Sequence, residues 1–375
     1  MRLFLSAGEA SGDAYAARLV RSIRQRRPDL EVQAVGGTRL FEAGVEPIAD
    51  SRSWGALGIL EALKVAPRVY SGYRKAVRAL QSGPPGLFIP VDFGYMNVKL
   101  CRQARARGWK VLYFIPPGSW RRDQQGADLP EITDALVTPF SWSADLLRQA
   151  GAQAHWFGHP LVQMVSESPP PPERRARQIA LLPGSRTHEI EHNLPVIAQA
   201  VRGLADQVEF AVASNVDPAD LQRLWAAHQG PEPALWTQGD PYGVLQRSQA
   251  ALLCSGTATL ESALCECPCV VMYRGSRWME FEYRIRKPKF SYIALPNLLL
   301  DEPVVPERIQ HDAHPEQLRR DLAPLLDANS SERRHQQDAF ARLRTILGPA
   351  TAFDQSADLA VSLLDSIQQT SSGIA

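Results

Sequence analysis

The chain has 375 residues, enough for about two domains with sizeable hydrophobic cores. A hydrophobic content of 45%, a charged content of 22% and a formal net charge of +1 are typical of an ordinary soluble globular protein. No apolar run approaches the ~20 residues that a membrane-spanning helix requires. We expect no signal peptide, because Arg2–Leu5 already has the pattern of a first strand.

The cysteine content argues against a disulfide-stabilised or zinc-binding protein. The five cysteines are odd in number and unevenly spaced, which favours reduced thiols in a cytosol. Cys265, Cys267 and Cys269 are separated from one another by a single residue. Zinc sites usually have two residues between paired cysteines and a second ligand pair elsewhere. We therefore predict no metal at Cys265, Cys267 and Cys269; the other two cysteines are Cys101 and Cys254.

The N-terminus has the pattern of a Rossmann-like unit. The strand Arg2–Leu5 is followed by the small-residue loop Ser6–Asp13 and by a helix over about residues 14–25. The loop lacks the third glycine of the dinucleotide fingerprint, and Glu9 and Asp13 would repel a pyrophosphate. An acidic loop is better suited to binding sugar hydroxyls, with helix capping as the alternative for both carboxylates.

A basic segment follows, with thirteen Lys or Arg and only two acidic residues between Arg52 and Arg122. Within it, Leu57–Val65 is crowded with apolar residues and has basic neighbours, a combination that favours contact with an anionic membrane surface. The alternative is a helix that packs on its own sheet with a solvated basic face. We expect no nucleic-acid partner, because the aromatic residues are not interleaved as stacking platforms.

Polar residues follow the carboxyl ends of the next two predicted strands. Gly86–Val91 ends at Asp92, a candidate general base, and Asn97 lies shortly after it. Lys110–Ile115 runs into a rigid loop that carries Trp120.

A proline-rich stretch, Ser166–Glu173, is the clearest linker in the chain. It divides the sequence into an N-terminal Rossmann-like domain (1–165), a linker (166–177), a second domain (178–350), and a terminal helix with a disordered tail (351–375).

The second half restarts as strand, loop and helix. The strand Gln178–Leu182 leads into Pro183–Arg186 and a helix that begins near Glu189. Arg186, just ahead of a helix N-terminus, is placed to pair bidentately with a phosphate.

A second anion-suited turn comes later in the same half. The apolar strand Ala250–Cys254 turns through Ser255–Thr257 and enters a helix at about Ala258. Small residues and unpaired helical N–H groups suit a diphosphate, and Glu261 one turn later could accept hydrogen bonds from sugar hydroxyls. The alternative is an ordinary junction with Ser255 or Thr257 as N-cap.

Together these patterns predict an α/β protein with two Rossmann-like domains facing a cleft, as suits sugar transfer from a nucleotide sugar. The chain contains no Asp-x-Asp triplet, which argues against a divalent-metal glycosyltransferase. It favours a protein that neutralises diphosphate with Arg and helix dipoles.

These motifs resemble those of the lipid-A-disaccharide synthase family. The matching stretches follow the family's order and span nearly the whole chain: Ser6–Asp13, Gly158–Leu161, Leu182–Arg186 with Glu189–Ile190, Ser255–Glu261 and Leu295–Leu299. The resemblance implies a GT-B fold and inverting transfer of 2,3-diacylglucosamine from its UDP donor to 2,3-diacylglucosamine 1-phosphate, without a cofactor. It also implies a cytoplasmic enzyme, peripheral on the inner face of the cytoplasmic membrane, and sometimes a homodimer with exchanged C-terminal segments.

The expected roles divide between the two domains: residues 1–165 face the acceptor and the membrane, and residues 178–350 form a Rossmann-like domain that binds the UDP-sugar. We predict Asp92 as the catalytic base. The donor side is expected at Ser185, Arg186, Glu189, Ser255, Gly256, Thr257 and Glu261, and the acceptor side at Glu9, Ser11, Asp13, Asn97 and Trp120.

Two departures from the family pattern fall on the acceptor side. Tyr95 replaces a second acid near Asp92, and Arg122 replaces a second Trp near Trp120. They leave three alternatives open: a GT-B enzyme with another acceptor, a UDP-sugar epimerase, and a non-catalytic UDP-sugar-binding paralogue.

Overall fold

The computed structural model describes residues 1–55, 59–118, 126–169, 173–275 and 292–372. The chain forms two compact units, one of residues 1–163 with 347–375 and the other of residues 164–346. Within the described residues, no helix is long and apolar enough to cross a membrane.

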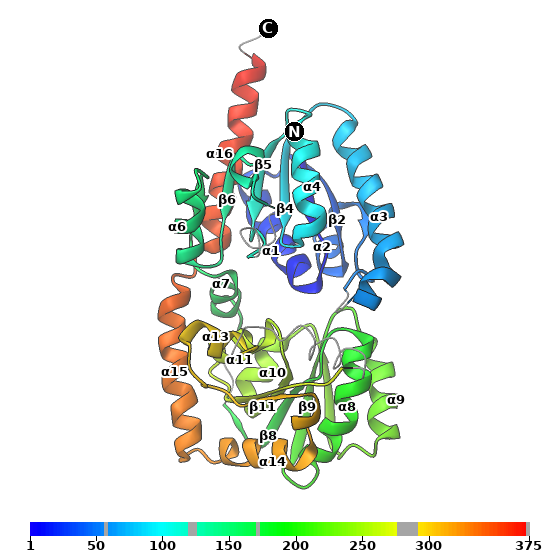
Figure 1. The fold of residues 1–375 in the computed structure, drawn as a ribbon, viewed down its shortest axis with the longest axis vertical. Coiled ribbons are helices and arrows are strands. Elements are labelled where there is room, and N and C mark those ends of the chain that lie inside the picture. The colour runs from blue at the N-terminus through cyan, green and yellow to red at the C-terminus, as the bar shows by residue number, and fades with distance from the viewer. Residues whose placement is uncertain (56–58, 119–125, 170–172, 276–291, 373–375) are drawn as a thin grey trace. The chain divides into compact units, whose positions relative to one another are not determined.

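The first unit contains a parallel sheet in the order β3-β2-β1-β4-β5-β6-β7 (Figure 1). Buried parallel strands read as continuous apolar runs, and Leu87–Val91 is buried at every position. The strands are β1 (Arg2–Ala7), β2 (Glu31–Gly36), β3 (Glu46–Asp50), β4 (Leu87–Val91), β5 (Lys110–Phe114), β6 (Ala135–Val137) and β7 (Ala154–His155).

Helices cover both faces of this sheet. On one face α1 packs against α16, and on the other α3 packs against α4. The helices of this region are α1 (Ala10–Arg26), α2 (Thr38–Glu42), α3 (Ile59–Gln81), α4 (Gly94–Arg105), α5 (Leu129–Ile132), α6 (Ser141–Gln149), α7 (Pro160–Ser166) and α16 (Ala352–Ser372).

The second unit repeats the plan with a parallel sheet in the order β10-β9-β8-β11-β12-β13. Its strands are β8 (Arg175–Leu182), β9 (Gln207–Val212), β10 (Ala234–Gln238), β11 (Ser248–Cys254), β12 (Cys269–Tyr273) and β13 (Glu307–Ile309).

The helices of the second unit also form two groups, with α8 contacting α9 and α14, and α11 contacting α10 and α13. They are α8 (Thr187–Val201), α9 (Pro218–Ala227), α10 (Pro241–Arg247), α11 (Ala258–Leu264), α13 (Leu295–Leu300), α14 (Pro315–Leu322) and α15 (Ser331–Leu347), with the 3₁₀ helices η1 (Gln310–Asp312) and η2 (Ala323–Leu326).

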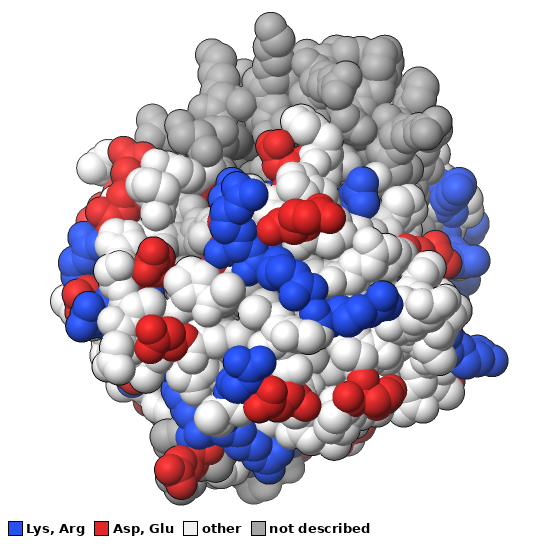
Figure 2. All heavy atoms as spheres, turned by 90° about the horizontal axis from the view of Figure 1, so that it is seen from below, with Lys and Arg blue, Asp and Glu red and all other residues white. Residues whose placement is uncertain are grey.

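The surface of the second unit near α14 carries charges of both signs. Figure 2 shows a band of basic side chains interspersed with acidic ones on this face. Arg319 of α14 donates to the carbonyls of Gln199 and Arg202, and Arg202 donates to the carbonyl of Gln229. These guanidinium groups satisfy carbonyls left open where α8 and α9 end.

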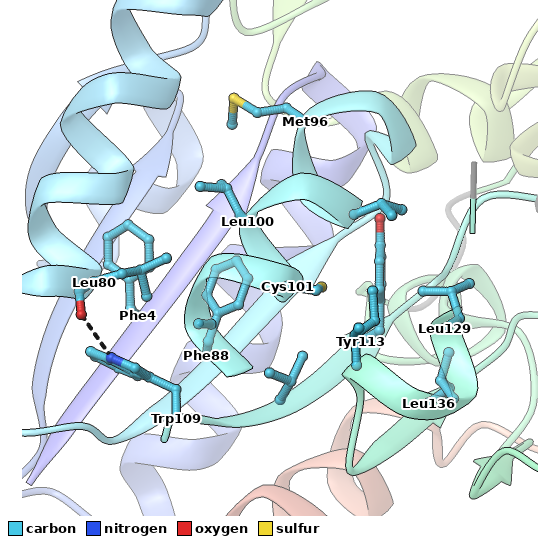
Figure 3. Packing of buried hydrophobic residues seen from close by; sticks show 14 of the residues in the cluster. Phe4, Leu80, Phe88, Met96, Leu100, Cys101, Trp109, Tyr113, Leu129 and Leu136 are labelled. Atoms are coloured by element: carbon cyan, nitrogen blue, oxygen red, sulfur yellow. Dashed lines mark hydrogen bonds between the residues drawn. The ribbon is translucent and has the colours of Figure 1, made fainter. Parts of the chain in front are cut away.

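Aromatic residues anchor the hydrophobic core of each unit. In the first unit, Phe4 and Phe88 stack with ring centroids 5.6 Å apart, and the Trp109 indole donates to the carbonyl of Leu80 at 2.9 Å (Figure 3). In the second, Phe210 stacks on Trp236 with ring centroids 4.2 Å apart. Both cores lie between a sheet and its helices, so each unit has its own interior.

Three differences from the expected boundaries change the reading of a loop, the linker or the tail. Helix α1 begins at Ala10 rather than Ala14, which places Ser11 and Asp13 in its first turn. Strand β8 begins at Arg175, within the segment predicted to be a linker. Helix α16 continues to Ser372, so residues 368–372, predicted to be disordered, are helical.

The terminal helix belongs to the first unit. Arg26 of α1 pairs with Asp358 at 2.5 Å, and Arg27 pairs with Asp365 at 2.6 Å. Phe353 is fully buried, with its ring centroid 5.8 Å from that of Phe114. The polypeptide therefore returns to the first unit at Leu347.

Candidate active site

Each sheet reverses its strand order at one point, between β1 and β4 in the first unit and between β8 and β11 in the second. At these points Ala7 pairs with Val91, and Leu182 pairs with Leu253. The loops that follow paired parallel strands therefore lie beside each other. Open α/β sheets bind ligands at such a switch point, outside the carboxyl ends of the strands.

Asp92 lies at the switch point of the first sheet. Its backbone N–H extends the ladder by donating to the carbonyl of Phe114 at 3.1 Å, and its side chain is partly buried. Burial and the negative charge of Glu9 raise the pKa of Asp92 from 3.8 to about 6, against a smaller lowering by the Phe93 N–H. A carboxylate with this pKa is ionised at neutral pH and still basic enough to accept a proton.

Asn97, expected on the acceptor side, is fully buried beneath this loop. Its side-chain amide donates to the backbone carbonyls of Asp92, Ser6 and Val91 at 2.8, 3.0 and 3.2 Å. The Ser6 hydroxyl donates to its oxygen at 2.6 Å, which fixes the orientation of the amide. Asn97 therefore supports the Asp92 loop from within.

The acidic loop after β1 divides into two parts. Glu9 is the N-cap residue of α1, and its negative charge raises the pKa of Asp92. Ser11 is partly exposed in the first turn of the same helix. Asp13 instead is buried, and its carboxylate accepts the backbone N–H groups of Gly37, Arg39 and Leu40. Asp13 thus caps the start of α2, which corresponds to the capping alternative for this residue.

The departures from the family pattern fall into two cases. Tyr95 lies on α4 and is 72% exposed, so its replacement of an acid leaves the interior unchanged. Trp120 and Arg122 lie outside the described residues.

Arg186 and Glu189 form a pair at the switch point of the second sheet. Arg186 is the N-cap residue of α8, and its guanidinium donates to Glu189 at 2.7 Å. The other carboxylate oxygen of Glu189 accepts the N–H of Ser185 at 3.3 Å. Gly184 has a φ of +124°, and a Cβ there would lie 2.7 Å from this carboxylate. The loop therefore requires glycine so that Glu189 can reach back and orient Arg186.

The neighbouring turn after β11 presents backbone donors. Within the described part of the chain, the N–H groups of Gly256 and Thr257 have no acceptor. Thr257 is the N-cap residue of α11, and its side chain makes no capping hydrogen bond. Among the residues that the structure places, no atom lies within 4 Å of a Cβ built at Gly256, so these residues leave space there. The Ser255 hydroxyl is directed to the carbonyl of Ile293 at 3.4 Å. These features suit an anion better than an ordinary capped junction.

Glu261 follows one turn into α11. Among the residues that the structure describes, its carboxylate has no hydrogen-bond or ion-pair partner. Burial raises the pKa of Glu261 from 4.5 to about 7. A desolvated carboxylate without a partner beside an anion-suited turn is a candidate for binding ligand hydroxyls.

Sequence reasoning missed two residues that connect these loops. The Asn193 amide donates to the carbonyl of Pro183 at 2.8 Å and accepts the N–H of Arg274 at 2.8 Å. It lies four residues after Glu189, so the two share one face of α8, a spacing that could have identified it. The Tyr113 hydroxyl donates to the carbonyl of Asp92 at 2.9 Å, and no local pattern marks that contact.

Two parallel sheets of this kind, each with its candidate residues at a switch point, define a GT-B glycosyltransferase fold. The solved structure of MurG from Acinetobacter baumannii has the same fold, with a TM-score of 0.54 and 14% identity over 96% of this chain and 99% of that one. The Staphylococcus aureus MnaA–UDP structure matches with a TM-score of 0.61 and 14% identity over 94% of each chain.

The sequence comparisons are more specific. The family model described as Lipid-A-disaccharide synthetase matches residues 3–356, so the chain belongs to that family. The lipid-A-disaccharide synthase of Myxococcus xanthus is 32% identical over 97% of both chains. That of Geobacter sulfurreducens is 33% identical over 87% of this chain and 88% of its own. The expected GT-B fold and glycosyltransferase family are therefore confirmed.

Proposed function

We propose that this chain transfers 2,3-diacylglucosamine from its UDP donor to 2,3-diacylglucosamine 1-phosphate. The products are the β-1,6-linked disaccharide phosphate and UDP. Membership of the Lipid-A-disaccharide synthetase family supports this reaction. The observation that carries the assignment is the pair of switch points, one with Asp92 and the other with Arg186, the Gly256 turn and Glu261.

Asp92 acts as the general base. Its carboxylate takes the proton of the acceptor 6-hydroxyl as that oxygen forms a bond to the anomeric carbon of the donor. The bond from this carbon to the UDP oxygen breaks from the opposite side, so the configuration is inverted. General base catalysis typically contributes about 10²–10⁴-fold to the rate.

The second unit stabilises the leaving UDP. Arg186 offers a charged donor, and the N–H groups of Gly256 and Thr257 offer two uncharged ones, so the developing diphosphate charge is met by positioned dipoles. Glu261 accepts hydrogen bonds from the ribose hydroxyls. The Staphylococcus aureus MnaA structure is a complex with UDP, which supports a UDP site on this fold.

Helix α3 contacts an anionic membrane surface. Its C-terminal half packs on the sheet through buried Ala76, Ala79 and Leu80. Earlier in the helix, Leu63 and Tyr70 are 64% and 62% exposed, seven residues apart on one face. The helix also carries five exposed basic residues, which are Lys64, Arg68, Arg74, Lys75 and Arg78. Exposed apolar residues on a helix rich in exposed cations suit peripheral binding to the inner face of the cytoplasmic membrane.

The C-terminal helix offers a route to a homodimer. The α1 surface that receives α16 in this chain would accept α16 of a second copy, because both would present Asp358 and Asp365 to Arg26 and Arg27. Sedimentation equilibrium distinguishes a dimer, which supports exchange, from a monomer, which contradicts it.

The reaction is tested by turnover on phosphatidylglycerol-containing vesicles with the diacylated UDP-sugar and the phosphorylated acceptor. We expect UDP release that requires the acceptor, together with a β-1,6-linked product. Epimerised UDP-sugar without acceptor, transfer to another sugar only, or UDP binding without turnover would each contradict the proposal.

A further inference from the structure

The carbonyl oxygen of Asp92 is held from two sides. It accepts a hydrogen bond from the Asn97 amide at 2.8 Å and another from the Tyr113 hydroxyl at 2.9 Å. Asn97 is on α4 and Tyr113 is on the neighbouring strand β5, so two different elements fix the same oxygen. Both donors are fully buried, whereas the Asp92 side chain is partly exposed.

This arrangement coincides with an uncommon backbone conformation. Asp92 has a φ of 50° and Phe93 a φ of 49°, two consecutive left-handed residues neither of which is glycine. Such conformations persist where the surrounding structure fixes them, and they gather at active sites. The left-handed turn rotates the chain out of β4 while the Asp92 N–H remains bonded to Phe114. The direction of the Asp92 side chain therefore depends on this turn.

The Phe93 ring closes the turn from the other side. It packs over Gly8, where an added Cβ would lie 2.1 Å from the ring, and its centroid is 6.0 Å from that of Trp54. Gly12 of α1 is also close, since a Cβ there would lie 3.7 Å from the Cβ of Asp92. The first turn of α1, the start of α4 and the end of β5 thus enclose Asp92.

We propose that Tyr113 is a positioning residue for Asp92: its hydroxyl, together with the Asn97 amide, holds the left-handed turn that aims the carboxylate at the acceptor hydroxyl. This inference deepens the proposed function and rests on Asp92 as the base. Tyr113 acts through the backbone of Asp92 and does not touch the reacting atoms.

Tyrosine suits this role because its hydroxyl stays protonated and can always donate a hydrogen bond. Burial raises the pKa of Tyr113 well above its usual range, so the hydroxyl keeps its proton at every pH at which the enzyme works. The orientation of the second donor is equally fixed, because the Ser6 hydroxyl donates to the Asn97 side-chain oxygen. The two donors therefore stay protonated and oriented while Asp92 titrates beside Glu9.

The test compares kcat and its pH dependence in four proteins: the parent, Tyr113→Phe, Asp92→Asn and the double variant. Removing the hydroxyl relaxes the turn and lets the carboxylate move, so Tyr113→Phe is expected to lower kcat roughly 10-fold, since misplacement by about 1 Å can cost 10²-fold. KM for the UDP donor stays the same. A carboxylate that is free to move is better hydrated, so its pKa is lower. The rise of kcat/KM on the acidic side of the pH profile, the acidic limb, is therefore expected to move from about pH 6 toward lower pH.

A matched control comes from the same core. Trp109 also donates from an aromatic side chain to a backbone carbonyl, that of Leu80. It lies immediately before β5, the strand that carries Tyr113, and Figure 3 shows it at the opposite end of the cluster from Tyr113. Trp109→Phe removes a buried donor without reaching Asp92. It is expected to lower the unfolding temperature while kcat per folded molecule and the acidic limb stay the same. Ser6→Ala, which releases the Asn97 amide, is expected to act like Tyr113→Phe with a smaller effect, and it replaces that variant if Tyr113→Phe does not fold.

The double variant separates the two proposals. If Tyr113 works through Asp92, Tyr113→Phe changes kcat by less than twofold in the Asp92→Asn background. The same loss in both backgrounds, or an acidic limb that stays at about pH 6, overturns the role of Tyr113 and leaves Asp92 as the base. An Asp92→Asn enzyme with full kcat overturns Asp92 itself, and the inference falls with it.

Discussion

The guanidinium of Arg186 donates to the carboxylate of Glu189 at 2.7 Å across the first turn of α8. The side chain of Glu189 is 5% exposed and that of Arg186 is 25% exposed. A buried carboxylate therefore holds a partly exposed guanidinium at the N-terminus of α8. Arg186 is thereby oriented before any ligand arrives, which reduces the ordering that binding requires.

Arg186→Ala is expected to weaken UDP binding roughly 10- to 100-fold, because hydrogen bonds to charged groups contribute about 1.5–3 kcal/mol. Isothermal titration calorimetry with UDP measures this change. The control is Arg202→Ala, since Arg202 is the C-cap residue of the same helix and donates to the carbonyl of Gln229. Equal losses in both variants would show a general effect on α8 and not a phosphate contact.

Asp92→Asn is expected to lower kcat by about 10²–10⁴-fold and to leave UDP affinity nearly unchanged. Asp134→Asn is the matched control, because Asp134 accepts the N–H of Val111 at 2.8 Å in the same sheet and is also mostly buried. That variant should lose stability and keep its kcat per folded molecule. Loss of UDP binding in Asp92→Asn would contradict the role of Asp92 as a base.

The pKa of Asp92 also fixes a pH dependence. Since the folded-state pKa is raised from 3.8 to about 6, kcat/KM should rise with pH through about 6 as the carboxylate ionises. The sign for stability is opposite: the raised pKa stabilises the fold at low pH, and this contribution is lost as pH rises through about 6. Asp92→Asn should therefore gain stability relative to the parent above pH 6, as chemical denaturation at several pH values would show.

Glu261→Gln is expected to weaken UDP and to leave the free base uracil unaffected, because the carboxylate accepts from the ribose. Hydrogen bonds to the ionised form favour it, so parent UDP affinity should rise with pH through about 7, the raised pKa of Glu261. Comparing the pH series with that of Glu261→Gln removes the titration of the phosphates themselves. The same pH dependence in both proteins would argue against a ribose contact.

Replacing both Leu63 and Tyr70 with Asp is expected to lower partitioning to anionic vesicles roughly 10-fold or more, since a fully buried apolar side chain contributes about 1.5–3 kcal/mol. Vesicle co-sedimentation at several salt concentrations measures it. Ile346→Asp is the control, because Ile346 on α15 is also a large apolar residue, 40% exposed. A similar loss in the control would show that α3 is not the membrane-binding surface.

The sequence predicted the sheets well because buried parallel strands leave apolar runs, as in Leu87–Val91 and Ala250–Cys254. It did not predict where α16 packs. An amphipathic helix shows that one face is buried but not against which surface, and the contact of Arg26 with Asp358 joins residues 332 positions apart.

At the candidate site, too, features set by the local sequence could be predicted and those set by tertiary packing could not. The positions of Asp92, Arg186 and Gly256 were predicted because strand ends and helix starts are visible locally, and all three follow strands at the switch points. Their roles stay predictions. The partner of Asp13, the start of α2, is set by tertiary packing and could not be read locally. Glycine is required at Gly158 by a contact with a residue far along the chain. A Cβ there would lie 1.9 Å from the carbonyl oxygen of Pro349.

We propose that the second unit binds uridine diphosphate without a metal, through Arg186, the Gly256 turn and Glu261. A crystal structure of the protein with UDP in the presence of EDTA tests it most directly. We predict that the diphosphate lies against the N–H groups of Gly256 and Thr257, with the ribose at Glu261. Diphosphate bound elsewhere, or binding that requires a divalent cation, would show that Arg186 and the Gly256 turn do not form the UDP site.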